Sequence, residues 1–413
     1  MLRTYGTLFV RGHFFLPTFN PYGIHFQQYK IICISALLVS TYRDSKINTL
    51  KIKDICNIIE NVAPLALQES YDNAGLLVGS AQMDVSGILL CIDITEAVID
   101  EAIGKNCNLI ISHHPLIFSG LKRLTGQNET QRCVAKAIKN DIAIYSAHTN
   151  IDNVLQGVNG KIAEKIGLTN TRILQPKSDI LLKLITFVPH EHAEKVRNAL
   201  FEAGAGQIGN YDACSYNLEG FGTFRAGEQA NPFVGHSGEI HTEPEMRIEL
   251  ILPVFLKNKV LGALFKAHPY EEPAFDFIPL KNTWKEAGAG IVGELQEAEN
   301  ESDFLLRLKK IFDLKVIRHT GFSGKKIKRV AVCGGSGSEL LKDALRVDAD
   351  VFISGDFKYH EFFNAENQIL IADIGHYESE QFTKEVFYDI ITKKLPTFAV
   401  RISETNTNPI NYL

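Results

Sequence analysis

The segment Asn108-Leu-Ile-Ile-Ser112 runs directly into His113-His114-Pro115, and this order of residues indicates the fold. A short apolar run without polar alternation is typical of a strand that is buried on both faces of a parallel sheet. Similar runs occur at Gly87–Ile92 and Ile142–Ser146, and helical patterns separate the three. Strands that alternate with helices predict an α/β lobe with a mainly parallel sheet.

The same alternation returns near the C-terminus, and the residues between the two regions follow another pattern. In the C-terminal region, apolar runs predict strands at Val330–Cys333, Asp350–Ser354, Gln368–Ala372 and Thr397–Val400. Between the regions, Lys183–Val188 is predicted as an edge-like strand, and Arg247–Leu252 alternates with period two. These patterns predict two related α/β lobes with mainly parallel sheets and an inserted α+β domain. The predicted boundaries are 51–175 for the first lobe, 180–282 for the insert and 286–413 for the second lobe.

Composition and charge restrict the class of protein. The chain has 413 residues, of which 45% are hydrophobic and 22% charged, as in a soluble globular protein of two or three domains. The net charge of −5 argues against nucleic-acid partners, and no run of 18 apolar residues predicts a membrane span. Seven scattered cysteines without a C-x-x-C pair indicate a reducing compartment, so we expect a cytoplasmic protein.

Residues 1–48 differ from the rest of the chain. The first 43 residues contain no Asp or Glu and are rich in Phe and Tyr. A targeting segment is one interpretation, although the apolar run lies far from the N-terminus. We favour the other interpretation, a poorly ordered extension.

Three predicted strand ends carry residues that can bind a metal ion. One strand is followed by His113 and His114, another by His148 and Asp152, and a third by His376 and Glu380. The carboxyl ends of parallel strands form the binding crevice of open α/β sheets, so these side chains are expected at one edge. Each residue alone is more often structural, but the joint pattern points to a site.

The ligand types indicate which metals would bind. Imidazole nitrogen and carboxylate oxygen without thiolate suit zinc, manganese or iron. His376 and Glu380 are four residues apart and share one face if their segment is helical. Three of these histidines together with the two carboxylates already exceed the three protein ligands of a usual catalytic zinc. If Glu380 bridges, the set can hold two ions.

Three segments, Ile111–Phe118, His148–Asp152 and Gly375–Glu380, resemble the metal-site motifs of the Nif-three-like family. Its bacterial members are called GTP cyclohydrolase 1 type 2 homologs or dinuclear metal centre hexameric proteins. The resemblance extends over roughly residues 51–413, and further similar segments are Tyr71–Leu76, Val332–Gly337 and Gly355–His360. Two departures are small: Tyr71 stands where Trp is usual, and Ser379 where Thr is common.

The resemblance implies two divalent metal ions per chain, with Glu380 bridging both. The implied ligands are His113, His114, Asp152, His376 and Glu380. It further implies a homohexamer, a small-molecule substrate such as the nucleotide GTP, and an inserted PII/CutA-like domain of ferredoxin-like fold. The leading hypothesis is therefore a metal-dependent hydrolase in which water activated by the metals attacks carbon or phosphorus. A non-enzymatic metal-binding, metal-delivering or scaffold ring is the alternative, and whether the protein is an enzyme stays open.

Other polar residues are weaker candidates. The turn Gly334–Ser338 could cradle a phosphate or be a plain tight turn. Lys358 and His360 follow a strand end and could contact substrate or lie on the surface. Cys333 has no activating neighbour, so a nucleophilic role is not expected. Three histidines of the insert are predicted to be structural or surface residues: His190, His192 and His268.

Overall fold

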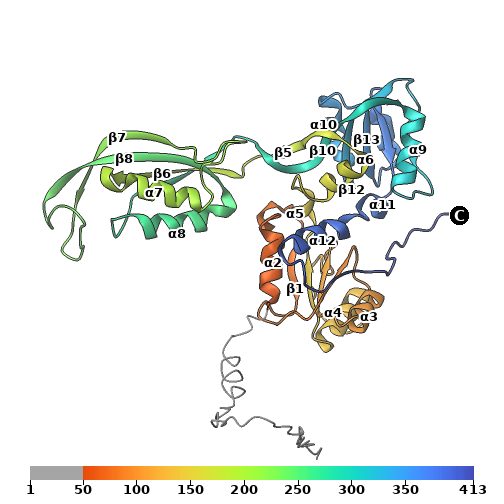
Figure 1. Ribbon diagram of the computed structural model, residues 1–413, viewed down its shortest axis with the longest axis horizontal. Coiled ribbons are helices and arrows are strands. Elements are labelled where there is room, and N and C mark those ends of the chain that lie inside the picture. The colour runs from red at the N-terminus through yellow and green to blue at the C-terminus, as the bar shows by residue number, and fades with distance from the viewer. Residues whose placement is uncertain (1–49) are drawn as a thin grey trace, which may run out of the picture. The chain divides into compact units, whose positions relative to one another are not determined.

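The computed structural model describes residues 50–413, whose strands form three sheets (Figure 1). The predictions for residues 1–48 lie outside the described residues. The first sheet has the order β1-β4-β3-β2-β15, with β1 as its antiparallel member. Its strands are β1 (Gly75–Val78), β2 (Ile88–Cys91), β3 (Leu109–Ser112), β4 (Ala143–Ser146) and β15 (Val400–Ile402).

Helices cover both faces of this sheet, which explains the continuous apolar runs. Leu90 and Ile111 face a core that includes α2 (Ile52–Glu60) and α12 (Thr383–Lys394). The alternate residues Leu89 and Ile110 face a second core with α3 and α4. Each strand residue therefore has an apolar environment, as expected of a parallel sheet. The second pair of helices is α3 (Glu96–Gly104) and α4 (Glu129–Lys139).

The second sheet has parallel strands at its centre and antiparallel strands at its sides. Its order is β11-β14-β13-β12-β10-β5, and β12, β13 and β14 are parallel. The strands are β5 (Thr169–Lys177), β10 (Trp284–Asn300), β11 (Arg318–His319), β12 (Lys326–Ser336), β13 (Val351–Gly355) and β14 (Leu370–Asp373). The helices that pack on it are α6 (Val158–Ile166), α9 (Glu301–Ile311) and α10 (Leu341–Arg346).

The insert is a ferredoxin-like domain, which confirms the predicted fold class. It runs strand, helix, strand, strand, helix, strand, and its sheet has the antiparallel order β7-β8-β6-β9. α7 and α8 lie on one side of this sheet (Figure 1). The elements are β6 (Leu181–Pro189), α7 (His190–Glu202), β7 (Tyr216–Arg225), β8 (Ile240–Pro253), α8 (Lys257–Ala267) and β9 (Phe275–Leu280).

Two local predictions were wrong. The strand predicted at the edge of the insert, Lys183–Val188, belongs to β6, which is hydrogen-bonded to β8 on one side and β9 on the other. The last strand was expected in the second lobe, but β15 pairs with β2 of the first sheet. His376 and Glu380 lie together in a short helix, α11 (His376–Glu380), which precedes α12. The domain boundaries themselves stay a prediction.

The insert should be removable without loss of metal binding. Lys177 of β5 is paired with Trp284 of β10, so an Asn-Gly turn can replace residues 178–283 and close a hairpin. Stability should fall, because Ile180 and Leu181 are buried in the main core and such side chains contribute about 1.5–3 kcal/mol each. Circular dichroism and elemental analysis test this. An unfolded or metal-free product would place the insert within the core fold.

Two further properties of residues 50–413 bear on the protein class. No helix in this part of the chain has both the length and the apolar character needed to cross a membrane. The six cysteines of the same residues are all free thiols.

Candidate metal centre

Each predicted ligand follows the carboxyl end of a strand. β3 leads directly into His113 and His114, β4 into the one-turn helix α5 (Thr149–Asp152), and β14 into the short helix α11 (His376–Glu380). β3 and β4 belong to the first sheet and β14 to the second. The carboxyl edges of the two parallel cores therefore meet at these residues.

The five predicted residues lie together around the carboxylate of Glu380. Its Oε2 is 3.0 Å from Nε2 of His114 and 3.2 Å from Nε2 of His376. Its Oε1 is 3.4 Å from Nε2 of His113, and that nitrogen is 3.8 Å from Oδ1 of Asp152. The buried carboxylate of Glu380 thus faces three imidazoles, and the carboxylate of Asp152 lies near one of them, that of His113.

The far nitrogens of the histidine rings are held by acceptors, and three of these are carboxylates that carry no predicted role. Asp93 accepts a hydrogen bond from Nδ1 of His114 at 2.6 Å, and Asp356 accepts one from Nδ1 of His376 at 2.7 Å. The remaining pairs are His113 Nδ1 with the Ala147 carbonyl at 3.1 Å and His148 Nδ1 with Asp72 at 2.9 Å. Such partners fix the ring orientation and leave Nε2 directed toward the centre, as around metal ions in proteins.

The residues fit divalent ions because two buried polar atoms of the cluster are unpaired. Nε2 of His113 and Oδ1 of Asp152 make no hydrogen bond, although both are inaccessible to solvent. Buried polar atoms are nearly always satisfied, so an orphaned pair of potential ligands indicates a missing partner. The ligand atoms of His114, His376 and Glu380 also lie within 4.8 Å of one another, as do those of His113, His114 and His148.

The electrostatics show how strongly the cluster is polarised without a metal. Burial alone raises the pKa of Glu380, but His113, His114 and His376 outweigh it and bring that pKa well below its usual range. Burial and the nearby charge of Glu380 raise the pKa of Asp152 well above its ordinary value. The pKa values of these two neighbouring carboxyl groups thus shift in opposite directions.

The histidines divide in the same way. Burial lowers the pKa of His113, whose ring is therefore neutral. Burial also opposes protonation of His114, but Asp93 and Glu380 dominate and raise its pKa to about 10. The hydrogen bond with Glu380 raises the pKa of His376 to about 9. Protons on His114 and His376 thus supply part of the positive charge that a metal ion would bring. Metal binding would displace these protons.

Glycine at position 335 makes room for Glu380. Gly335 has φ of +65°, and a Cβ atom there would lie 2.2 Å from Oε1 of Glu380. The amide of Gly335 donates to the hydroxyl of Ser379, and that of Gly334 donates to Asn159. These amides are therefore not free for a phosphate, and the carboxyl-terminal end of β12 supports the cluster instead.

The weaker candidates lie outside the cluster. Lys358 and His360 are exposed, and the ring of His360 contacts Tyr359. Both ring nitrogens of His268 are used within the insert, by the carbonyl of Phe187 and the amide of Tyr270. The remaining weak candidates are His190, exposed at the start of α7, His192, whose ring contacts Phe233, and Cys333, whose thiol pKa is raised by burial.

His148 is the main residue that the sequence prediction omitted from the ligand set. It precedes α5, and its ring lies 5.2 Å from that of His113 and 5.5 Å from that of His114, measured between centroids. It begins the segment His148–Asp152, so its position after a predicted strand end was the signal that could have identified it. Asp93 and Asp356 also follow strand ends, after β2 and β13, but their role depends on contacts with distant histidines that the sequence does not show.

A cavity of about 460 Å³ opens beside the cluster, and the C-terminal segment forms one of its walls. His114 and His376 line one side, and Arg318, Tyr377 and Tyr412 line others. The guanidinium of Arg318 pairs with Asp373 at 3.0 Å. The volume is in the range of small-molecule sites.

Glu101 anchors the segment that forms this wall. Its carboxylate accepts hydrogen bonds from the hydroxyls of Ser403 and Thr405, the amides of Glu404 and Thr405, and the ammonium of Lys105. Partial burial raises the pKa of Glu101, but Lys105, Ser403 and Thr405 outweigh it and bring the pKa to about 2. Because this pKa lies below the usual value of about 4.3, the stabilisation is present at neutral pH and is lost only as the pH falls through about 4 to 2.

Replacing Glu101 with Ala should release residues 403–412. The free energy of unfolding should fall by about 1–3 kcal/mol, because several donors lose a charged acceptor. Limited proteolysis with mass spectrometry detects the released segment, and urea unfolding gives the energy. Glu96→Ala is the matched control, since Glu96 lies in the same helix and makes an exposed pair with Arg132. Equal protection of the segment in both variants would contradict the anchoring role.

Comparison with known proteins places this geometry in a wider context. The sequence profile of the Duf34/NIF3 (NGG1p interacting factor 3) family matches residues 50–409. The chain is similar to the GTP cyclohydrolase 1 type 2 homolog of Halalkalibacterium halodurans, with 39% identity over 87% of this chain and 98% of the relative. The corresponding protein of Bacillus subtilis is 38% identical over 87% and 98% of the two chains.

Solved structures agree with the sequence comparison. The structure of a Bacillus cereus protein related to NIF3 is similar with a TM-score of 0.76 and 37% identity, over 88% of this chain and 100% of that one. A Staphylococcus aureus protein has a TM-score of 0.71 and 32% identity, over 89% and 100% of the two chains. At these identities the similarity covers the lobes, the insert and the cluster together.

Proposed function

The chain belongs to the Duf34/NIF3 family, and from that premise we propose that it is a dinuclear metal-dependent hydrolase acting on a small molecule. The observation that carries the proposal is the buried cluster in which Glu380 faces three imidazoles while His113 and Asp152 leave polar atoms unpaired. The name shared by the curated relatives, GTP cyclohydrolase 1 type 2 homolog, suggests a nucleotide as the first substrate to test.

The proposed ligands are His113, His114, Asp152, His376 and Glu380, with Glu380 shared by both ions. All of them offer nitrogen or oxygen, which favours zinc, iron or manganese. His148 lies close enough to complete the set on the side of His113 and His114. Bound divalent ions supply Lewis-acid chemistry, polarising a substrate oxygen and activating water.

The chain's own residues bind and orient the substrate. His113 is fully buried, whereas the side chain of His376 is 38% exposed and lines the adjacent cavity. A substrate therefore reaches the cluster from the side of His114 and His376. Asp93 and Asp356 hold these two rings in place, so the ring edges keep one orientation as the substrate enters.

We further propose that six chains form a ring. Each chain has two lobes, and their separate surfaces can contact two neighbouring chains in a closed, symmetric assembly. In such a ring the cavities beside the clusters would admit small substrates and exclude macromolecules.

A turnover screen tests the hydrolase proposal. Metal-loaded protein is incubated with GTP, other nucleotides and phosphoesters, and products are followed by mass spectrometry. A product that forms with metal-loaded protein and not with chelated protein supports the proposal. Full metal loading without turnover across the panel would favour the alternative, a ring that binds or delivers metal.

A further inference from the structure

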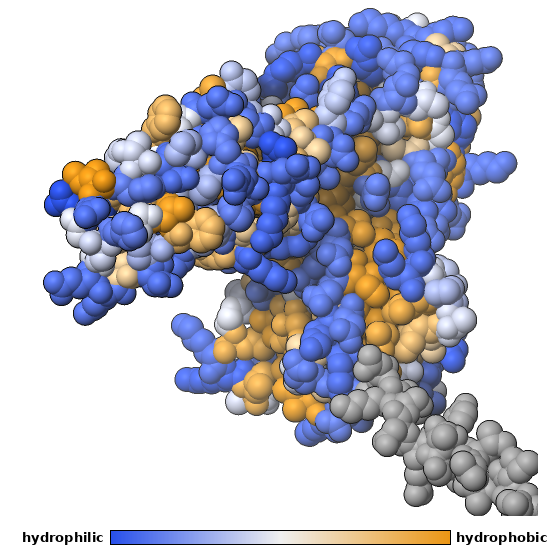
Figure 2. Space-filling model, turned by 60° about the vertical axis from the view of Figure 1, so that its left-hand side comes forward, coloured by the Kyte–Doolittle hydropathy of each residue, from blue (hydrophilic) through white to orange (hydrophobic). Residues whose placement is uncertain are grey.

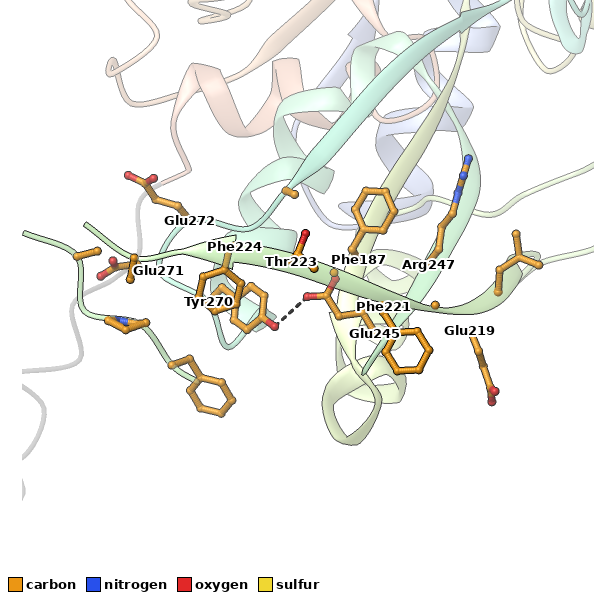
Figure 3. Close-up of a pocket in the computed structure, with 18 residues that line it drawn as sticks. Phe187, Glu219, Phe221, Thr223, Phe224, Glu245, Arg247, Tyr270, Glu271 and Glu272 are labelled. Atoms are coloured by element: carbon orange, nitrogen blue, oxygen red, sulfur yellow. Dashed lines mark hydrogen bonds between the residues drawn. The ribbon is translucent and has the colours of Figure 1, made fainter. Parts of the chain in front are cut away.

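A second cavity, of about 650 Å³, lies within the insert and is not part of the metal centre (Figure 3). Its walls are formed by β7 and β8, by residues 230–233 of the loop between them, and by residues 270–274 after α8. None of the metal-cluster residues lines it. Its volume is within the range of small-molecule sites.

The lining of this cavity is aromatic and acidic. It contains four glutamates and a single basic residue, Arg247, giving a formal charge of −3. Arg247 is already paired with Glu249, which lies outside the lining, at 2.7 Å. The cavity therefore presents a negative potential that favours cations.

Glu245 is the buried member of this acidic set. It is 8% exposed, and its Oε1 accepts a hydrogen bond from the hydroxyl of Tyr270 at 2.8 Å. Among the described residues, no Lys, Arg or His lies within ion-pairing distance of its carboxylate. A carboxylate that lines a cavity without a neutralising partner favours a cationic ligand there.

Aromatic rings surround this carboxylate. Figure 3 shows Tyr270 and Phe224 beside Glu245, and Phe187 and Phe221 also line the cavity. The rings of Phe224 and Tyr270 have centroids 6.3 Å apart. Aromatic faces beside a carboxylate are the elements by which proteins recognise organic ammonium groups.

The backbone leaves room for this arrangement. Gly222 of β7 faces Glu245, and a Cβ atom at this position would lie 2.2 Å from Oε2.

The exposed surface of the insert also carries apolar side chains, including Phe221, Phe233 and Ile240, and patches of this kind interrupt the hydrophilic surface in Figure 2. Of these exposed apolar residues, Phe221 and Phe233 line the cavity together with Glu245.

We propose that the insert binds a small organic cation, with its ammonium group next to the Glu245 carboxylate and against the rings of Phe224 and Tyr270. A hydrated inorganic ion would gain little from the aromatic walls, and an anion would be repelled by the four glutamates. The site is separate from the proposed hydrolase centre, so it can be tested whether or not that centre turns over substrate.

Choline is a suitable probe because it has a neutral isostere, 3,3-dimethyl-1-butanol, in which carbon replaces nitrogen. Titration calorimetry or ligand-observed NMR on the full chain should detect choline and show at least about tenfold weaker binding of the isostere. Glu245→Gln keeps the side-chain shape and should weaken choline binding about tenfold. Gly222→Ala keeps the charge but displaces the carboxylate, and should also weaken it.

Glu194→Gln is the matched control, because Glu194 is an exposed residue of α7 outside the cavity. It removes the same charge from the insert and should leave choline affinity unchanged. Circular dichroism checks that each variant is folded. Equal affinity for choline and its isostere, no binding of choline at all, or unchanged affinity in folded Glu245→Gln would overturn the proposal.

Discussion

Replacing Glu380 with Ala should reduce the bound metal from about two divalent ions per chain to less than one. Glu380 is 3% exposed and lies within 3.4 Å of three imidazoles, so a carboxylate at this position contacts whatever occupies the centre of the cluster. Its loss removes the negative charge that both ions would share, so the remaining ligands would hold a cation less strongly. Elemental analysis of protein purified without chelators measures the change.

Glu378→Gln provides the control for this experiment. Glu378 lies in the same short helix, but its carboxylate accepts a hydrogen bond from Asn408 and is not part of the cluster. The control should retain about two ions per chain. If the Glu380 variant keeps its full metal complement, the bridging assignment is wrong.

Removing the metals, or replacing His114 with Ala, should abolish turnover and leave the assembly intact. His114 contacts both Glu380 and His376 and lines the cavity, so its loss disrupts the centre at the side where substrate would enter. Effects of this kind on a two-metal centre are expected to exceed about a thousandfold. Light scattering should still give a mass near six times 46.1 kDa.

His190→Ala is the matched control, because His190 is exposed at the start of α7 and distant in sequence from every proposed ligand. Its activity and mass should equal those of the unaltered protein. Turnover that survives complete metal removal would contradict the hydrolase proposal. A monomeric mass in the unaltered protein would contradict the ring.

Much of the fold could be predicted because the informative signals are local. Apolar runs such as Leu109–Ile111 identify strands buried on both faces, and the structure places them in the parallel part of the first sheet. Three of the five predicted ligands follow their strands within a few residues, and His376 and Glu380 share a helix. Local sequence patterns were therefore enough to predict that all five residues lie at the carboxyl ends of the parallel strands.

The partners of these residues could not be predicted in the same way. Asp72, Asp93 and Asp356 each fix a histidine that is 20 or more positions away in the chain. Their own neighbourhood places Asp93 and Asp356 after strand ends, but it does not show which histidine each of them holds. The same holds for Gly335, whose contact with Glu380 spans two segments of the second lobe.

The sequence alone determined the alternation of strands and helices, the ferredoxin-like insert implied by the family resemblance, and the residue types at the strand ends. Only the tertiary structure decided that β15 returns to the first sheet, that β6 lies inside its sheet, and that His148 joins the cluster. It also decided that buried Glu245 shares a cavity with aromatic side chains and, within residues 50–413, has no ion-pair partner. The physical reason is that hydrophobic periodicity reports burial of a segment, whereas pairing, ion contacts and cavities depend on which distant segments the folded core brings together.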